Sequence, residues 1–135
     1  MHHYTLCGWH VASAIALPGV AGWVGEADAP DIRIALGAVP DRLDAPLLDL
    51  PTVQVDRAGR VRFEVPGVLA CLIEGGADVI VTTARPDEAA NFLLGTVFGI
   101  LCHQRGHLPL KAAAVEIDGR AVLLGGATGT GKSTL

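Results

Sequence analysis

The chain has 135 residues, half of them hydrophobic, with a formal net charge of −4 and an isoelectric point of about 5.6. This length suits one domain, or one small domain and part of another, and the apolar content is sufficient for a core. A sequence without a basic tract and with few aromatic residues argues against nucleic acid and anionic membranes as partners. No stretch reaches the roughly 20 apolar residues of a membrane-spanning helix. The three widely spaced cysteines are expected to be small buried residues, which fits a reducing, cytoplasmic location.

The first 84 residues predict a β-rich region. Residues 4–15 alternate loosely between apolar and polar and predict a first strand, and residues 32–36 predict a second. Prolines interrupt the pattern between residues 40 and 51, so we expect a surface connection there.

Two hairpins are expected next. Residues 53–65 alternate on both sides of Ala58-Gly59, which predicts a hairpin with one apolar and one solvated face. Residues 69–83 show the same pattern around Gly75-Gly76. We therefore expect residues 1–84 to form an antiparallel β region.

Residues 87–105 predict one long, largely buried helix. Pro86 suits the first helical position, two acidic residues follow it at the positive end of the helix dipole, and Gly106 is a natural stop. Gly95 and Gly99 lie four residues apart, which would allow another element to approach the helix closely there, a packing signal.

A third hairpin leads into a phosphate-loop motif. Residues 108–117 predict a strand, Asp118-Gly119 a two-residue turn, and residues 120–125 the return strand. The pattern Gly-x-x-x-x-Gly-Lys-[Ser/Thr] then runs from Gly126 to Ser133. The short apolar strand directly before the motif is the context that a phosphate loop requires.

The motif has the groups that a nucleoside triphosphate and Mg²⁺ require. Glycines let successive backbone N–H groups point at the phosphates, and the N-terminus of a following helix adds positive charge. Lys132 is expected to contact the β- and γ-phosphates, Ser133 to bind Mg²⁺ and Thr134 to add a phosphate contact. The predicted nucleotide-binding residues are Gly126, Ala127, Thr128, Gly129, Thr130, Gly131, Lys132, Ser133 and Thr134.

The residues leading into this motif resemble the HPr kinase/phosphorylase-like family. The similarity covers about residues 87–135, and it is carried by Leu101-Cys102-His103-Gln104-Arg105-Gly106, by Leu108-Pro109-Leu110, by residues 113–124 and by the loop. It implies an ATP-dependent kinase, with ATP and Mg²⁺ as cofactors and a protein or peptide serine as substrate. It also implies an α/β fold similar to the nucleotide domain of phosphoenolpyruvate carboxykinase, with Lys132 as the catalytic residue.

On this interpretation the chain has two parts. Residues 1–84 are the β-rich N-terminal region, and residues 85–135 are the first part of a nucleotide domain, made of one long helix, a hairpin and the phosphate loop. The full-length form is then the kinase.

The sequence departs from the family pattern at two points. HPr kinases have a histidine at the start of the strand before the hairpin, where this chain has Lys111. Lysine can hold a phosphate, but it is not a neutral proton acceptor at pH 7 unless its pKa is strongly lowered. The family's paired acids, one a general base and one a Mg²⁺ ligand, follow the loop, and only two residues follow Ser133 here. We therefore expect these 135 residues alone to bind ATP·Mg weakly or not at all and to show no kinase turnover.

Two other interpretations of the motif stay open. A phosphate loop after a Val-Leu-Leu-Gly strand also suits an ABC-type ATPase. That class, however, stacks adenine on an aromatic residue some tens of residues upstream of the loop, and no Phe, Tyr or Trp lies between Cys102 and Leu135. The third interpretation is a non-catalytic fragment or interaction module, since the loop helix and flanking parallel strands are not in this sequence.

Other polar candidates have simpler explanations. His103 and His107 have the spacing of metal ligands on a helix, but Gly106 is expected to end the helix between them. Asp118 is expected to serve the hairpin turn, and Glu116 to be a solvated strand residue.

Overall fold

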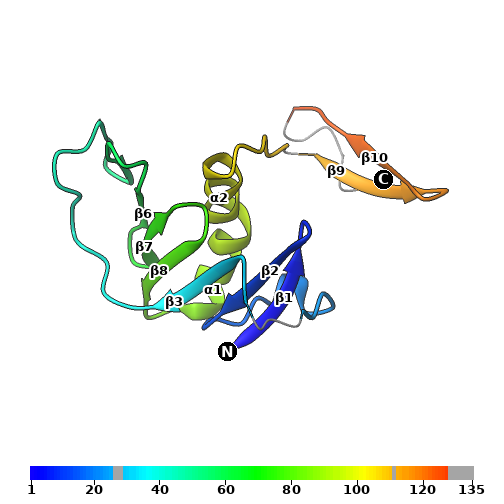
Figure 1. Cartoon of the computed structure of the whole chain (residues 1–135), viewed down its shortest axis with the longest axis horizontal. Coiled ribbons are helices and arrows are strands. Elements are labelled where there is room, and N and C mark those ends of the chain that lie inside the picture. The colour runs from blue at the N-terminus through cyan, green and yellow to red at the C-terminus, as the bar shows by residue number, and fades with distance from the viewer. Residues whose placement is uncertain (26–28, 111, 128–135) are drawn as a thin grey trace.

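The structure, a computed structural model, describes residues 1–25, 29–110 and 112–127. Within these residues it is a strand-rich α/β arrangement, with an eight-stranded mixed sheet and one long helix packed against it (Figure 1). A separate two-stranded hairpin follows the helix and stands clear of the sheet in the same view.

The large sheet has the strand order β1-β2-β3-β8-β7-β6-β5-β4. Strand β3 is parallel to both β2 and β8, and the other neighbouring strands are antiparallel. The prediction of an antiparallel region over residues 1–84 is thus correct for the hairpins and wrong for the centre of the sheet. The strands are β1 (His2–Leu6), β2 (Trp9–Ser13), β3 (Ile32–Leu36), β4 (Leu48–Asp49), β5 (Val53–Val55), β6 (Val61–Val65), β7 (Leu69–Glu74) and β8 (Asp78–Thr83).

The first predicted strand is in fact a hairpin. Residues 4–15 contain a sharp turn at Cys7 and Gly8, which have φ angles of 53° and 80° and bring Leu6 opposite Trp9. Two consecutive positive φ angles are typical of the tight turns that join antiparallel strands. The prediction of one strand was wrong because a cysteine before the glycine gives little sign of such a turn.

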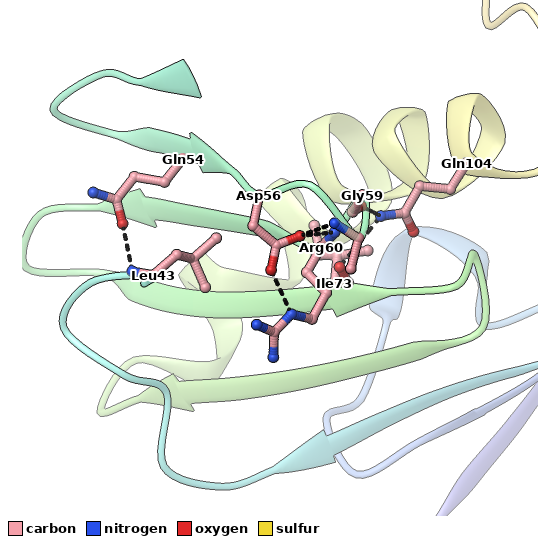
Figure 2. Close-up of polar contacts among 8 residues, drawn as sticks. Leu43, Gln54, Asp56, Gly59, Arg60, Ile73 and Gln104 are labelled. Carbon is pink, nitrogen blue, oxygen red and sulfur yellow. Dashed lines mark hydrogen bonds and ion pairs between the residues drawn. The ribbon is translucent and has the colours of Figure 1, made fainter. Parts of the chain in front are cut away.

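The hairpin of β5 and β6 is confirmed, with Val53 opposite Phe63. The prediction that one face of this hairpin is solvated is wrong, because Gln54 and Arg62 on that face are each only 6% exposed. The Leu43 N–H donates to Gln54 Oε1 at 2.9 Å (Figure 2), and Arg62 Nε donates to the Pro40 carbonyl at 2.7 Å. The connection after β3 therefore covers this side of the hairpin, held by the polar residues that alternation assigned to solvent.

The predicted turn at Ala58-Gly59 is confirmed and is organised by Asp56. Its carboxylate accepts hydrogen bonds from the N–H groups of Ala58 and Arg60 at 2.9 and 3.0 Å and from Arg60 Nε at 2.6 Å (Figure 2). The bond from the Arg60 side chain contributes most to holding the pKa of Asp56 below its ordinary value.

The hairpin of β7 and β8 is also confirmed. Gly75 and Gly76 take φ angles of 61° and 66° in its turn, as two adjacent glycines predict. Alternate residues of these strands, including Cys71, Ile73 and Val81, are fully buried and belong to the core under the helix.

The helix runs from residue 86 to residue 104, close to the predicted 87–105. It comprises α1 (Pro86–Phe92), a π-helical turn η2 (Leu93–Val97) and α2 (Phe98–Gln104), and a short 3₁₀ helix η1 (Pro18–Val20) lies earlier in the chain. One face is buried against the sheet through Ala89, Ala90, Leu93, Val97 and Leu101. The opposite face is open, so the prediction of a largely buried helix holds for one side only.

Candidate functional site

A hairpin positions the start of the phosphate-loop motif. Strand β9 (Ala113–Ile117) pairs antiparallel with β10 (Arg120–Leu124), and Val115 lies opposite Val122. Asp118 and Gly119 have φ angles of 50° and 72°, which confirms the predicted two-residue turn. The first strand begins at Ala113, five residues later than residue 108 where the pattern placed it.

The motif begins where β10 ends. Leu124 is the last residue of the strand, and Gly126 and Ala127 follow it in exposed, non-regular backbone. The other predicted binding residues lie outside the described residues; they are Thr128, Gly129, Thr130, Gly131, Lys132, Ser133 and Thr134. They include the predicted catalytic residue, Lys132, and the predicted Mg²⁺ ligand, Ser133. Lys111 also lies outside the described residues. The phosphate contacts therefore stay predictions.

The β9–β10 hairpin exposes apolar side chains. Val115, Val122 and Ile117 share one face by their register and are 43%, 38% and 54% exposed, and Leu123 on the other face is 54% exposed. Glu116 is exposed, as predicted for a solvated strand position. A two-stranded hairpin is marginally stable without packing on at least one face, so these faces are suited to contact another element.

The residues that carry the family resemblance before this hairpin form the end of the long helix. Gly106 has a φ angle of +76°, its N–H donates to the His103 carbonyl at 3.0 Å, and the His107 N–H donates to the Cys102 carbonyl at 2.8 Å. This is the Schellman arrangement that ends helices at glycine, so the predicted stop at Gly106 is confirmed. His107 consequently lies beyond the helix, and within the described ranges no group of three or more His, Cys, Asp or Glu is placed to hold a metal ion.

Gln104 joins the end of the helix to two turns of the sheet. Its Nε2 donates to the carbonyls of Gly59 at 2.8 Å and Ile73 at 3.2 Å (Figure 2), and its Oε1 accepts from the Gly76 N–H at 2.8 Å. One amide therefore satisfies three backbone groups, two in the turns at Gly59 and Gly76 and one in β7 at Ile73. No local sequence pattern indicates this role, because the partners are 28 to 45 residues away.

Arg105 makes a second link between the helix and the sheet. Its Nε donates to the Gly76 carbonyl at 2.6 Å and its Nη2 to the Asp31 carbonyl at 2.8 Å. The guanidinium carbon lies 4.7 Å from the centre of the Trp9 ring, in cation–π geometry. The planar fork of arginine suits this combination of stacking and directed donation.

A groove of about 950 Å³ lies along the open side of the helix. Gly95 and Gly99 would allow a closely packed element, but apart from the helix's own neighbouring backbone no described atom lies within 4 Å of a Cβ built at either position. In the part of the chain described, both glycines line open space. The other walls include Cys7, Trp9, Phe98, Cys102, His107 and Leu110.

The cysteines differ from the expectation that all three are buried. Cys71 is fully buried, Cys102 is half-buried and Cys7 is exposed, all as free thiols. Burial raises the pKa of Cys71 to about 12, so its reactive thiolate form is suppressed. Burial also raises the pKa of Cys102, with a smaller contribution from the charge of Cys7.

Comparison of the chain with models of protein families, with curated proteins and with solved structures finds no match. Among the residues described, no helix combines the length and apolar character needed to cross a membrane. The case for function therefore depends on the residues of the chain itself.

Proposed function

We propose that residues 126–134 bind the phosphates of ATP·Mg. One observation carries the proposal: a complete phosphate-loop motif begins at Gly126, directly after β10 ends at Leu124. A strand that delivers the chain into a glycine-rich loop is the context in which this motif binds phosphate. In the proposed site Lys132 contacts the β- and γ-phosphates, and the Ser133 hydroxyl coordinates Mg²⁺.

We further propose that this loop serves an HPr-kinase-like enzyme that transfers the γ-phosphoryl group to a serine hydroxyl of a protein or peptide. This part depends on the resemblance carried by residues 101–124, whose fold would be similar to the phosphoenolpyruvate carboxykinase nucleotide domain. The transfer also needs a general base and a second Mg²⁺ ligand, which the family places after the loop. A cytoplasmic location belongs to the same proposal, since free thiols persist in a reducing compartment.

The kinase is preferred to an ABC-type ATPase because residues 103–135 contain no phenylalanine, tyrosine or tryptophan to stack on adenine. An interaction module is the remaining alternative, and the exposed apolar faces of the β9–β10 hairpin favour it. The kinase and the interaction module are distinguished by whether substitution of Lys132 lowers the affinity for the nucleotide.

The test is a titration of fluorescent ATP with Mg²⁺ into two proteins, the 135-residue chain and any longer natural protein that contains it, each with and without Lys132→Ala. We expect weak or undetectable binding to the chain alone. In the longer protein we expect clear binding that Lys132→Ala abolishes, because it removes a charge-assisted contact to the phosphates.

Unchanged affinity in the longer Lys132→Ala variant would refute the phosphate-loop assignment. Low-micromolar binding by the chain alone would show that the residues after Leu135 are not needed for the nucleotide. Phosphate transfer from γ-labelled ATP to a serine peptide by the longer protein tests the kinase assignment separately.

A further inference from the structure

Two thiols open onto the same groove beside the end of the helix. Cys7 lies in the turn between β1 and β2 and is exposed, and Cys102 lies in the last turns of α2 and is half-buried. Both line the cavity of about 950 Å³, although they are 95 residues apart in the sequence (102 − 7).

Trp9 shows how the turn and the helix meet. Its ring lies 5.8 Å from the ring of Phe98 and 5.3 Å from the ring of His107. Phe98 is four residues before Cys102, so the two side chains lie on the same face of the helix. Cys7 is only two residues before Trp9, and the β1–β2 turn therefore reaches the part of the helix that carries Cys102.

The electrostatics of this placement agrees with the two thiols being neighbours. A charge on Cys7 disfavours the thiolate of Cys102 and adds to the raised pKa of Cys102, after the larger effect of burial. Cys71 has neither property, since it is fully buried in the core. The chain thus contains one pair of thiols that share a surface groove and one internal control.

We propose that Cys7 and Cys102 form a site of reversible oxidation, which becomes an intramolecular disulfide by exchange with a low-molecular-weight disulfide such as oxidised glutathione. The Cys7 thiolate attacks one sulfur of the glutathione disulfide, its S–S bond breaks, and one glutathione thiolate leaves. The Cys102 thiolate then attacks the Cys7 sulfur of the mixed disulfide and expels the second glutathione. Two protein thiols are oxidised by two electrons, one glutathione disulfide is reduced to two thiols, and these take up the two protons that the cysteines lose.

The order of attack follows from exposure. Cys7 is open to a solvent-borne disulfide, whereas Cys102 is partly covered and is the resolving thiol. The bond would join the β1–β2 turn to α2 across the groove, in addition to the existing contacts of Trp9.

The experiment incubates the reduced full chain with oxidised glutathione under non-denaturing conditions and follows it by intact mass and by disulfide mapping after digestion. We expect a monomer lighter by about 2 Da, the mass of the two thiol hydrogens lost, with Cys7 linked to Cys102 and Cys71 still free. The variants Cys7→Ser and Cys102→Ser cannot close the bond, and Cys102→Ser is expected to hold one glutathione on Cys7.

The control variant Cys71→Ala should form the same disulfide as the natural chain. A natural chain that carries glutathione on Cys7 without closing the bond, or that forms only disulfides between molecules or with Cys71, would overturn the proposal. Closure should raise the Tm relative to the reduced protein, since a cross-link spanning 95 residues (102 − 7) restricts the unfolded chain. An unchanged or lower Tm on closure would show that the two sulfurs are held apart in the native fold, and would also count against it.

Discussion

The Gln104 side chain donates a hydrogen bond from Nε2 to the Gly59 carbonyl at 2.8 Å, across 45 residues of sequence (Figure 2). The same amide bonds to Ile73 and Gly76, and the neighbouring Arg105 bonds to Gly76 and Asp31. The end of the helix is therefore fixed to the sheet by polar contacts to backbone, in addition to the apolar face that covers the core. Since the β9–β10 hairpin follows this point, these contacts determine where the chain leaves the sheet.

Gln104→Ala should lower the free energy of unfolding by about 1–3 kcal/mol, because it removes three hydrogen bonds and leaves partly buried backbone groups without that partner. Urea denaturation of the two proteins measures the difference. The matched control is Asn91→Ala on the exposed side of the helix, which should change stability little. Equal, small effects of the two substitutions would show that the Gln104 contacts do not contribute.

Gly99 within the helix and Gly106 just after its end should respond to alanine in opposite directions. Gly106→Ala should destabilise by about 1 kcal/mol or more, because φ is +76° and a side chain is strained in that conformation. Gly99→Ala lies within α2, where no described atom would meet the new methyl group, and should stabilise by about 0.5–1 kcal/mol. Thermal unfolding followed by circular dichroism measures both, and a loss of stability in Gly99→Ala would contradict the open groove at that position.

Arg105→Lys should destabilise by about 1 kcal/mol although it retains the charge. Lysine cannot donate to Gly76 and Asp31 together while stacking on Trp9. The emission of Trp9, measured in a Trp23→Phe background, should also change as the ring loses the guanidinium over its face. Trp23 is 59% exposed and is the only other tryptophan of the sequence, so its replacement isolates the signal. An unchanged spectrum and unchanged stability would argue against the stacked geometry.

Asp56→Asn should lower the urea midpoint at pH 7, and the difference should shrink as the pH falls below about 4. The Arg60 side-chain hydrogen bond is the largest cause of the lowered pKa of Asp56 in the folded state. A carboxylate with a lowered folded pKa contributes stability above its unfolded pKa, and this contribution disappears as the pH falls through the folded value. Urea curves of both proteins at pH 7 and pH 3 measure the effect, with Asp78→Asn on an exposed strand position as control. If the difference in urea midpoint between the two proteins did not depend on pH, the charge of Asp56 would make no contribution to stability.

Local sequence patterns predicted most of the elements. Alternation and adjacent turn residues located the hairpins at 53–65 and 69–83, and a third hairpin that was predicted over 108–125 and spans 113–124. Apolar spacing with Pro86 and Gly106 located the helix. They failed at Cys7-Gly8, where the turn residues are atypical, and at Gln54 and Arg62, whose polar side chains lie under a loop.

The candidate site also has one part that was predicted from the sequence and is present in the structure, and another part that was not. The strand that leads to Gly126 was predicted from the sequence and is present, whereas the Lys132 and Ser133 contacts stay predictions from the motif. Gln104 and Arg105 hold the end of the helix, a role that the sequence did not predict, because nothing local to these residues identifies their partners.

By itself, the sequence determined the three hairpins after residue 52, the helix, the end of that helix at Gly106 and the phosphate-loop motif beginning at Gly126. Each of these depends on conformational preferences and side-chain periodicity within about twenty consecutive residues. Only the tertiary structure decided that β3 lies parallel between β2 and β8, that Gln104 bonds to Gly59, and that Cys7 and Cys102 share a groove. These pairings join residues far apart in the chain, and they form because burying one face of the sheet under the helix brings distant segments together, which no local pattern encodes.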